Sequence, residues 1–246
     1  MVQHNLAEET SMDSITMRQT QVQVRVNSFV RSVYNWMAVG LALTGFIAYA
    51  VANMPEVRNV IFGSRIVFFG LIIAQLALVF IISSRIYRMQ AGTATALFIV
   101  YSALNGATLS SIFLAYAQST ITSTFFVCSA TFVACSIYGW TTRRDLTSMG
   151  GFLTMGLIGI VIASLVNLFI QSSAISTIVS YIGVLVFVGL TAYDTQEIKN
   201  MAMAQPHDID AGAVRKGAIL GALKLYLDFI NLFLMLLRIF GGSREK

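Results

Sequence analysis

The chain has 246 residues, of which 57% are hydrophobic and only 11% charged, and its formal net charge is +5 at pH 7. A soluble domain carries about 25% charged residues, so these few charges cannot cover a water-exposed surface of this size. The composition excludes a soluble protein and predicts an all-α integral membrane protein. The excess of positive charge is then expected in basic cytoplasmic segments, and no nucleic-acid partner is predicted.

The chain divides into three predicted parts. Residues 1–28 are polar and contain no apolar core of signal-peptide length, so we expect a cytoplasmic tail and no cleaved secretory signal. Residues 29–241 form the predicted transmembrane domain, and residues 242–246 form a short C-terminal tail.

Charged and polar residues mark the ends of the predicted spans. Two apolar windows, 32–55 and 66–84, each match one helix, since about 20 residues cross a bilayer. The uncharged window 89–142 is long enough for two helices divided at residues 118–120, and the window 146–193 for two divided at 171–173. A last run, 217–240, completes seven helices. These continuous apolar runs lack the alternation that a membrane β-barrel requires.

The distribution of Lys and Arg predicts the orientation. With a cytoplasmic N-terminus, the short outside loops carry only Arg58 and Arg65, while the inside segments carry most of the basic residues. Seven spans then place the C-terminus outside. The basic C-terminus argues against this, and a sixth or seventh segment that re-enters the membrane would be the alternative. Glycines recur in most spans, where we expect close helix packing rather than function.

Charged side chains within the spans are few, and each is costly in a bilayer. Asp194 lies near the end of the sixth predicted helix, and Lys224 and Asp228 lie within the seventh. On the seventh helix, one stripe at spacings of three and four residues follows a single face: Gly217, Gly221, Lys224, Asp228, Asn231, Met235 and Arg238. Such a stripe predicts a helix at the centre of the bundle that lines a cavity or pathway.

Simpler interpretations of these charges remain open. Lys224 and Asp228 are spaced as an i, i+4 ion pair that needs no further purpose, although this would not explain a stripe along the whole helix. Asp194 alone could be an interfacial residue in water. Asp228 lies about 16 Å into its helix, so the two aspartates face each other only if the sixth helix extends past Asp194 or the inner mouth is recessed.

Three segments resemble the Bax inhibitor-1 family of transmembrane Bax-inhibitor-motif proteins. The run from Gly221 to Gly241 resembles the C-terminal signature of that family, and the segment 193–198 is similar to its motif on the sixth helix. The segment 105–110 resembles the small-residue element of its third helix. The resemblance is to the bacterial type and covers about residues 20–241.

The resemblance implies a seven-helix bundle with helix seven central, and a pH-sensitive calcium leak channel. It implies that Asp194 and Asp228 are the sensor pair and transient Ca²⁺ ligands, with no resident cofactor and Ca²⁺ as the permeant ion. An arginine at the end of helix two is implied as the partner of Asp194, matched by Arg88 or, one turn away, Arg85. Arg238 matches the end of the signature, and Gly221, Asn231 and Met235 belong to the predicted pore-lining stripe.

The hypothetical mechanism uses the two carboxyl groups as a latch. A proton shared by Asp194 and Asp228 keeps helices six and seven together, and ionisation of both separates them by repulsion. Asp194 then exchanges partners with Arg88, and oxygen ligands replace water around Ca²⁺. Lys224 has no counterpart in the family pattern. Its charge one turn from Asp228 would oppose Ca²⁺ entry.

Other functions are weighed against the channel. A regulatory protein that binds other membrane proteins, without transport, is the main alternative, with residues 1–28 and 199–216 as contact segments. No metalloprotease, lipase or nucleotide-binding motif occurs, and an aspartyl protease lacks the second motif it needs, so no enzyme is predicted. A retinal protein would need an acidic counter-ion on a neighbouring helix, and the third predicted helix of this chain contains no acid. The compact loops suit a bacterial inner membrane, although the family also occupies eukaryotic internal membranes.

Overall fold

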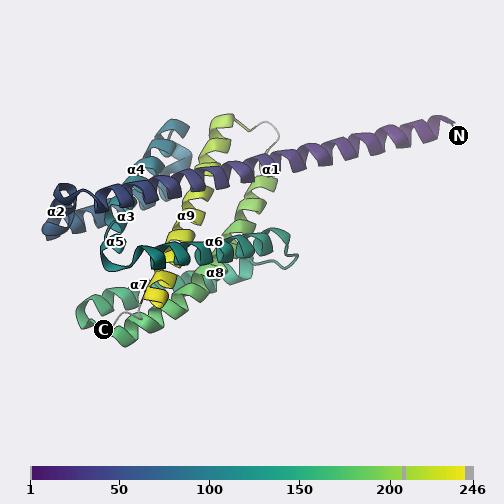
Figure 1. Ribbon diagram of the computed structural model, residues 1–246. Coiled ribbons are helices and arrows are strands. Elements are labelled where there is room, and N and C mark those ends of the chain that lie inside the picture. Colours follow the sequence, from purple (N-terminus) through teal and green to yellow (C-terminus); the bar gives the residue numbers. More distant parts are fainter. Residues whose placement is uncertain (1, 207–208, 242–246) are drawn as a thin grey trace.

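The computed structural model describes residues 2–206 and 209–241, with side chains from Thr20 onward. The described residues are almost entirely helical and contain no strand (Figure 1). In chain order the elements are α1 (Val2–Ala52), α2 (Pro55–Gly63), α3 (Arg65–Arg85), the 3₁₀ turn η1 (Ile86–Arg88), α4 (Ala91–Leu109), α5 (Ile112–Ala115), α6 (Gln118–Thr141), α7 (Thr147–Ile170), α8 (Ser173–Met203) and α9 (Ala211–Gly241).

Seven of these helices are long and apolar enough to cross a membrane, which confirms the predicted all-α integral membrane fold. The break at residues 171–172 falls within the predicted one, and the break at residues 116–117 lies directly before the predicted seam at 118–120. At the second break Gln171 takes a left-handed conformation with φ of 54°, which ends α7. Both α8 and α9 are continuous over 31 residues, so the re-entrant alternative has no support in the described residues.

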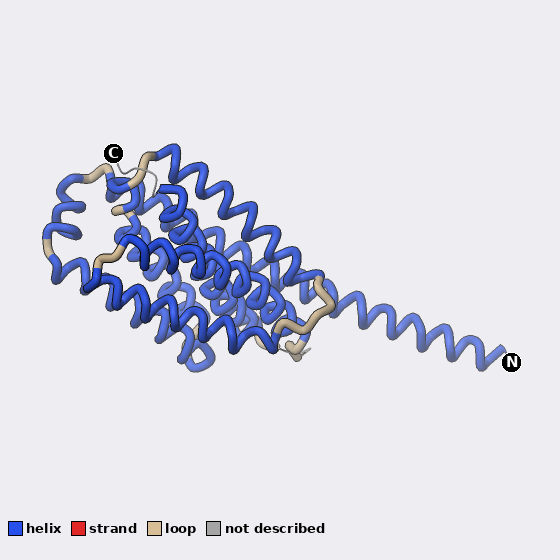
Figure 2. Tube along the Cα trace, turned by 90° about the horizontal axis from the view of Figure 1, so that it is seen from below, coloured by secondary structure: helices blue, strands red, loops and turns tan. Residues whose placement is uncertain are grey.

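The predicted boundary at residue 28 is not a structural boundary. α1 is one continuous helix from Val2 to Ala52, and its N-terminal part projects away from the bundle (Figures 1 and 2). No Pro precedes Pro55 and no Gly precedes Gly40, so nothing in the sequence interrupts the helix where its composition changes from polar to apolar. The predicted tail 242–246 lies outside the described residues.

The last span is the most buried helix of the bundle. In α9, 78% of the apolar window is buried, against 39% in α8 and 6% in α3. It packs against α1, α4, α6 and α8, while α7 packs mainly on α8. The C-terminal end of α9 and the N-terminus lie at opposite ends of the bundle (Figure 2).

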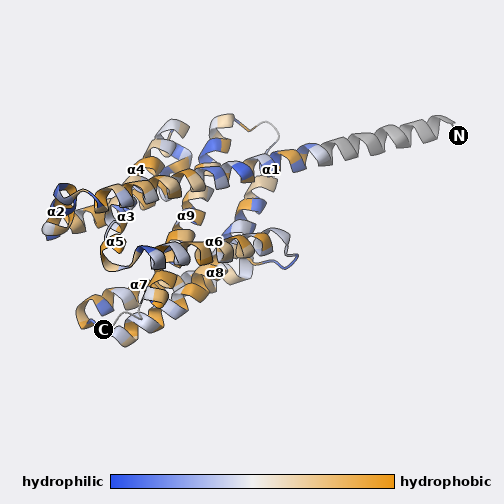
Figure 3. Ribbon diagram, viewed as in Figure 1, coloured by the Kyte–Doolittle hydropathy of each residue, from blue (hydrophilic) through white to orange (hydrophobic). Residues whose placement is uncertain are grey.

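The outer helices carry their apolar side chains outward, as helices in lipid do. Ile66 and Phe80 on α3 and Phe169 on α7 are 86%, 73% and 86% exposed. Figure 3 shows that apolar residues predominate along the helices, with hydrophilic residues mainly at their ends and in the loops. The core instead follows α9, where nearly every side chain from Gly217 to Leu237 is buried.

Some glycines allow the closest helix crossings, as predicted, whereas Gly45, Gly92, Gly151 and Gly159 have open space beside them. A Cβ on Gly106 of α4 would lie 2.6 Å from the carbonyl oxygen of Thr44 on α1. Gly139 of α6 lies directly against the backbone of Ala192 on α8, so any side chain there would overlap it. These contacts are van der Waals packing of backbones, which stabilises helix association where no hydrophobic driving force exists.

Candidate functional site

The candidate site lies between α8 and α9, which form the most extensive helix pair in the described residues. Asp194 and Glu197 are one helical turn apart on α8, and Lys224 and Asp228 are one turn apart on α9. α8 continues nine residues past Asp194 to Met203, which meets the condition for its carboxyl group to face the last helix. Four ionisable side chains therefore share one interface.

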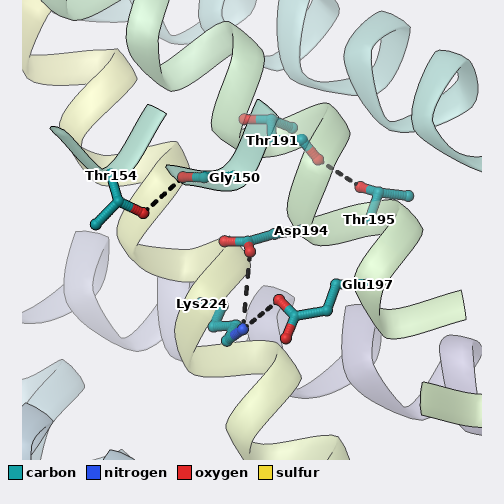
Figure 4. A network of polar contacts seen from close by, with 7 residues as sticks. All are labelled: Gly150, Thr154, Thr191, Asp194, Thr195, Glu197 and Lys224. Carbon is teal, nitrogen blue, oxygen red and sulfur yellow. Dashed lines mark hydrogen bonds and ion pairs between the residues drawn. The ribbon is translucent and has the colours of Figure 1, made fainter. Parts of the chain in front are cut away.

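Lys224 links the two helices. Its Nζ donates a hydrogen bond to Oε2 of Glu197 and lies 3.8 Å from Oδ1 of Asp194 (Figure 4). The side chain of Glu197 is 37% exposed, that of Lys224 31%, and that of Asp194 13%. Exposure to solvent therefore decreases through the cluster, from the partly exposed Glu197 to the buried Asp194.

Asp228 is the innermost member of the cluster. It is 4% exposed, and its Oδ2 has no hydrogen-bond partner among the donors of the described residues. The carboxyl group of Asp194 is close enough to hydrogen-bond with that of Asp228, provided that one of the two carries a proton. Because two buried carboxylates in contact repel each other strongly, this arrangement favours one proton held by the pair.

The arginines expected to pair with Asp194 are elsewhere. Arg85 ends α3 and Arg88 ends η1; both are exposed, and neither forms an ion pair with any residue that the structure describes. α3 and η1 pack on α4 and α9 rather than on α8, which holds these side chains away from Asp194. In this structure the cationic partner of Asp194 is Lys224, and an exchange toward Arg88 or Arg85 stays a prediction.

The polar stripe of α9 packs against neighbouring helices. A Cβ on Gly221 would lie 3.2 Å from Val33 of α1, and the Met235 side chain fills the space over Gly183 of α8. The Asn231 amide donates to the carbonyl oxygen of Leu227 in its own helix, and Arg238 is exposed at the helix end. The larger cavities described below are lined by other residues, so a pore-lining role of the stripe stays a prediction.

The C-terminal part of α8 is fixed to the end of α6 and to the α6–α7 connection. Gln196 accepts from the backbone N–H of Leu146 at 2.8 Å and donates to the carbonyl oxygen of Arg144 at 2.9 Å. Lys199 donates to the carbonyl oxygen of Trp140 at 2.7 Å. These contacts set the rotation of α8, with Asp194 and Glu197 on the face that meets α9.

The sequence interpretation did not find Glu197, because the sixth span was taken to end near residue 193. Extending the helix would have placed Glu197 three residues after Asp194 on the same face. No three His, Cys, Asp or Glu side chains of the described chain are arranged to hold a metal ion.

Fold and site define a seven-span helical membrane protein with a carboxyl-rich ionic cluster around its most buried helix. A family model described as "Inhibitor of apoptosis-promoting Bax1" matches residues 26–245. The chain therefore belongs to the Bax inhibitor-1 family.

Bacterial relatives match over nearly the whole chain. "Inner membrane protein YbhL" of Escherichia coli K12 is 54% identical over 235 residues, covering 95% of this chain and all of that protein. An uncharacterised protein of Rickettsia prowazekii is 46% identical, covering 88% of this chain and 90% of its own. An uncharacterised protein of Borreliella burgdorferi is 43% identical, covering 95% of this chain and all of its own.

Proposed function

We propose that the protein is a pH-sensitive calcium leak channel whose closed state is the one described above, with Asp194 and Asp228 as the gate. The observation that carries the proposal is the contact of two carboxyl groups in the bundle interior, with Oδ2 of Asp228 unpartnered by the donors of the described residues. An acidic side chain buried within a membrane is costly, so we expect it to have either an interaction partner or a functional role. A shared proton supplies the partner in the closed state.

Loss of that proton is the proposed trigger. The ionisable groups that face the pair are Lys224 from α9 and Glu197 and Tyr193 from α8. Lys224 already serves two carboxylates and cannot neutralise a third, so ionisation of Asp228 increases the net negative charge of the cluster inside the bundle. Repulsion would then separate α9 from α8 as the pH rises. A few kcal/mol suffice to shift such a two-state equilibrium.

In the open state, carboxylate oxygens would serve as passing ligands for the ion. Ca²⁺ prefers oxygen ligands, and Asp194 and Asp228 offer four such atoms. Asp194 would take Arg88 or Arg85 as its new partner, which requires a movement of the helix end that carries them. Lys224 competes with the ion for the same carboxylates, so we expect it to hold the leak low.

Reconstituted vesicles test the proposal. Calcium entry into liposomes loaded with an indicator is measured over a range of pH, and we expect it to rise with pH for the unaltered protein. Asp228→Asn cannot ionise and should remove the pH response. The control is Glu56→Gln, which neutralises an exposed acid on α2 and should leave the response intact. An unchanged response in Asp228→Asn would rule out the latch.

The packed stripe favours a second candidate function. Because Gly221 and Met235 are buried against other helices, a non-transporting protein that regulates other membrane proteins fits the same observations. Its contact segments would be residues 1–28 and 199–216. Vesicles that pass no ion at any pH would favour this function over the channel.

We further propose a bacterial inner membrane location with the N-terminus in the cytoplasm and the C-terminus outside. The low number of Lys and Arg in the outside loops supports this orientation. A reporter enzyme that is active only outside the cytoplasm, fused after residue 246, tests it. Activity of the fusion is the expected result, and inactivity together with activity of a cytoplasmic reporter would reverse the orientation.

A further inference from the structure

A groove runs between α1 and α6, two of the helices long and apolar enough to span a membrane. It encloses about 660 Å³, with α1 and α6 as its walls and with Phe229 of α9 and Thr195 of α8 reaching its floor. Its walls are mostly apolar, and Leu41 and Phe125 contribute to them. Within a membrane such a groove is filled by something, since an apolar hollow next to lipid is not left to water.

The length of the groove matches one lipid chain. On α1 its lining extends from Val30 to Leu41, which is roughly 16 Å of helix. One leaflet of the hydrocarbon core measures about 15 Å, half of the bilayer core. A second hollow of about 320 Å³ shares Leu41, Phe125 and Phe229 with the first and continues toward the far end of α1. The groove therefore follows the depth of the membrane.

Aromatic and polar side chains line part of the groove. Trp140, near the C-terminal end of α6, lines one end, and Tyr34 and Asn35 lie near the middle of the α1 wall. Trp and Tyr are typical of the boundary between lipid chains and headgroups, where one side of the ring is apolar and the other is wet.

Cations surround the same end. Arg31 is exposed one turn before Asn35, and Lys199 lies 5.2 Å from the ring centre of Trp140. Arg143 and Arg144 are exposed just after α6, followed by one acid, Asp145, whose carboxylate accepts from the backbone N–H of Thr147. The end of the groove is thus positive, which complements an anionic headgroup.

We propose that this groove binds one anionic phospholipid, with an acyl chain lying between α1 and α6 against Phe229. Its phosphate-bearing headgroup lies at the end marked by Arg31 and Lys199. The bound chain occupies the space that keeps α1 and α6 apart and covers the residue that follows Asp228. This assignment is independent of ion transport, and its test involves no flux.

Tryptophan fluorescence tests the proposal, because Trp140 lines the groove and the chain has only two Trp residues. Trp36→Phe leaves Trp140 as the sole fluorophore. The protein is placed in vesicles of phosphatidylcholine and phosphatidylglycerol, with brominated chains on one lipid or the other as the quencher. We expect Trp140 to prefer the anionic lipid about fivefold, the gain that one basic residue provides near a charged surface.

Two variants and one matched control isolate the groove. Ala38→Phe fills the groove from α1 and should abolish the preference, and Arg31→Gln should lower it without abolishing it, because the other cations at that end remain. Ala130→Phe adds the same ring on an exposed position of α6 outside the groove and should change nothing. If Trp36→Phe does not fold, the two-tryptophan protein is compared with Trp140→Phe instead.

Two results would overturn the assignment. Equal quenching by both lipids, unaffected by Ala38→Phe, would mean that Trp140 meets only ordinary surrounding lipid. Protection of Trp140 from both brominated lipids would mean that another occupant, such as a second copy of the chain, fills the groove.

Discussion

Tyr226 and Asp228 lie two residues apart on the most buried helix, and their surroundings are opposite in kind. The Tyr226 hydroxyl accepts from Asn105 at 2.9 Å and lies 2.6 Å from the hydroxyl of Thr44, which donates to the carbonyl oxygen of Ser102. The Tyr226 ring packs edge-on against Phe98 and Tyr101. This network is neutral, and each of its groups has a partner.

The Asp228 side of the helix is charged and incomplete. It holds three acids and a lysine, one carboxylate oxygen lacks a donor among the described residues, and its outer members are partly exposed. A neutral network with every group satisfied fixes one arrangement of helices. A charged cluster that can gain or lose a proton is compatible with two arrangements of the helices. Burial alone therefore does not distinguish these two kinds of polar site, whereas charge and completeness do.

The neutral site should give the largest loss of stability. Tyr226→Ala removes a fully buried ring and the centre of the network, so we expect a loss of about 3–5 kcal/mol in unfolding free energy. The measurement is chemical unfolding in mixed micelles. Tyr181→Ala removes an exposed tyrosine of α8 and should cost about 0.5 kcal/mol or less. Equal losses in the two variants would contradict the assigned role of the network.

The charged site should give a smaller loss that depends on pH. Lys224→Met leaves Asp194, Glu197 and Asp228 without their cation, and breaking a buried pair costs about 3–5 kcal/mol. Since the Lys224 side chain is 31% exposed, we expect about 1–3 kcal/mol. The loss should be largest at high pH, where the acids are ionised, and should shrink as falling pH protonates them.

Lys199→Met is the matched control for that dependence. Lys199 contacts Trp140 rather than an acid, so the cost of its loss should not vary across the acidic range. A loss in Lys224→Met that is likewise constant with pH would mean that its ion pairs contribute little.

Removal of the Tyr226 hydroxyl should reveal a further difference between the neutral network and the charged cluster. Tyr226→Phe keeps the ring and leaves the amide of Asn105 with only a 3.5 Å contact to Tyr101. We expect a loss of about 1–2 kcal/mol, the cost of an unsatisfied buried donor. This loss should be the same at every acidic pH, because the network titrates no group there. Unfolding curves at two pH values provide the check.

The smallest effect is expected outside both sites, in the loop before α7. The carboxylate of Asp145 accepts hydrogen bonds from Thr147, which hold its pKa below the ordinary value. A depressed pKa stabilises the fold above the pKa of the unfolded state, and this stabilisation is lost as the pH falls through the folded pKa. Asp145→Asn should remove that slight acid sensitivity. NMR titration of the carboxyl carbon gives the pKa, and an ordinary value would refute the expectation.

The sequence predicted most of the fold, because span length and charge depend on few physical quantities. The seven spans and their breaks followed from apolar runs and polar seams. The continuation of α1 and α8 could not be predicted in this way, since both helices extend into polar sequence without a Pro or Gly to stop them. The change from apolar to polar sequence indicates where the hydrocarbon core of the membrane ends, whereas the helix itself can continue beyond that point.

For the candidate site, the sequence indicated which residues are buried charges but not how they pair. Asp194, Lys224 and Asp228 were found by their cost in a membrane. Their partners depend on which helices pack together, and the packing of α3 on α4 rather than α8 cannot be read from spacing. Glu197 was missed with the end of α8. Tyr226 was also missed as a polar centre, because an aromatic residue in an apolar run looks like ordinary core.

The contact between Gly139 and Ala192 has a mechanical consequence. Because the two backbones touch with no side chain between them, we expect α6 and α8 to move together as one rigid unit. Gln196 holds the C-terminal part of α8 to the loop that follows α6, and Lys199 holds it to the carbonyl oxygen of Trp140 near the end of α6. If Asp194 and Asp228 separate as proposed, the movement would come from α9, which Lys224 links to α8.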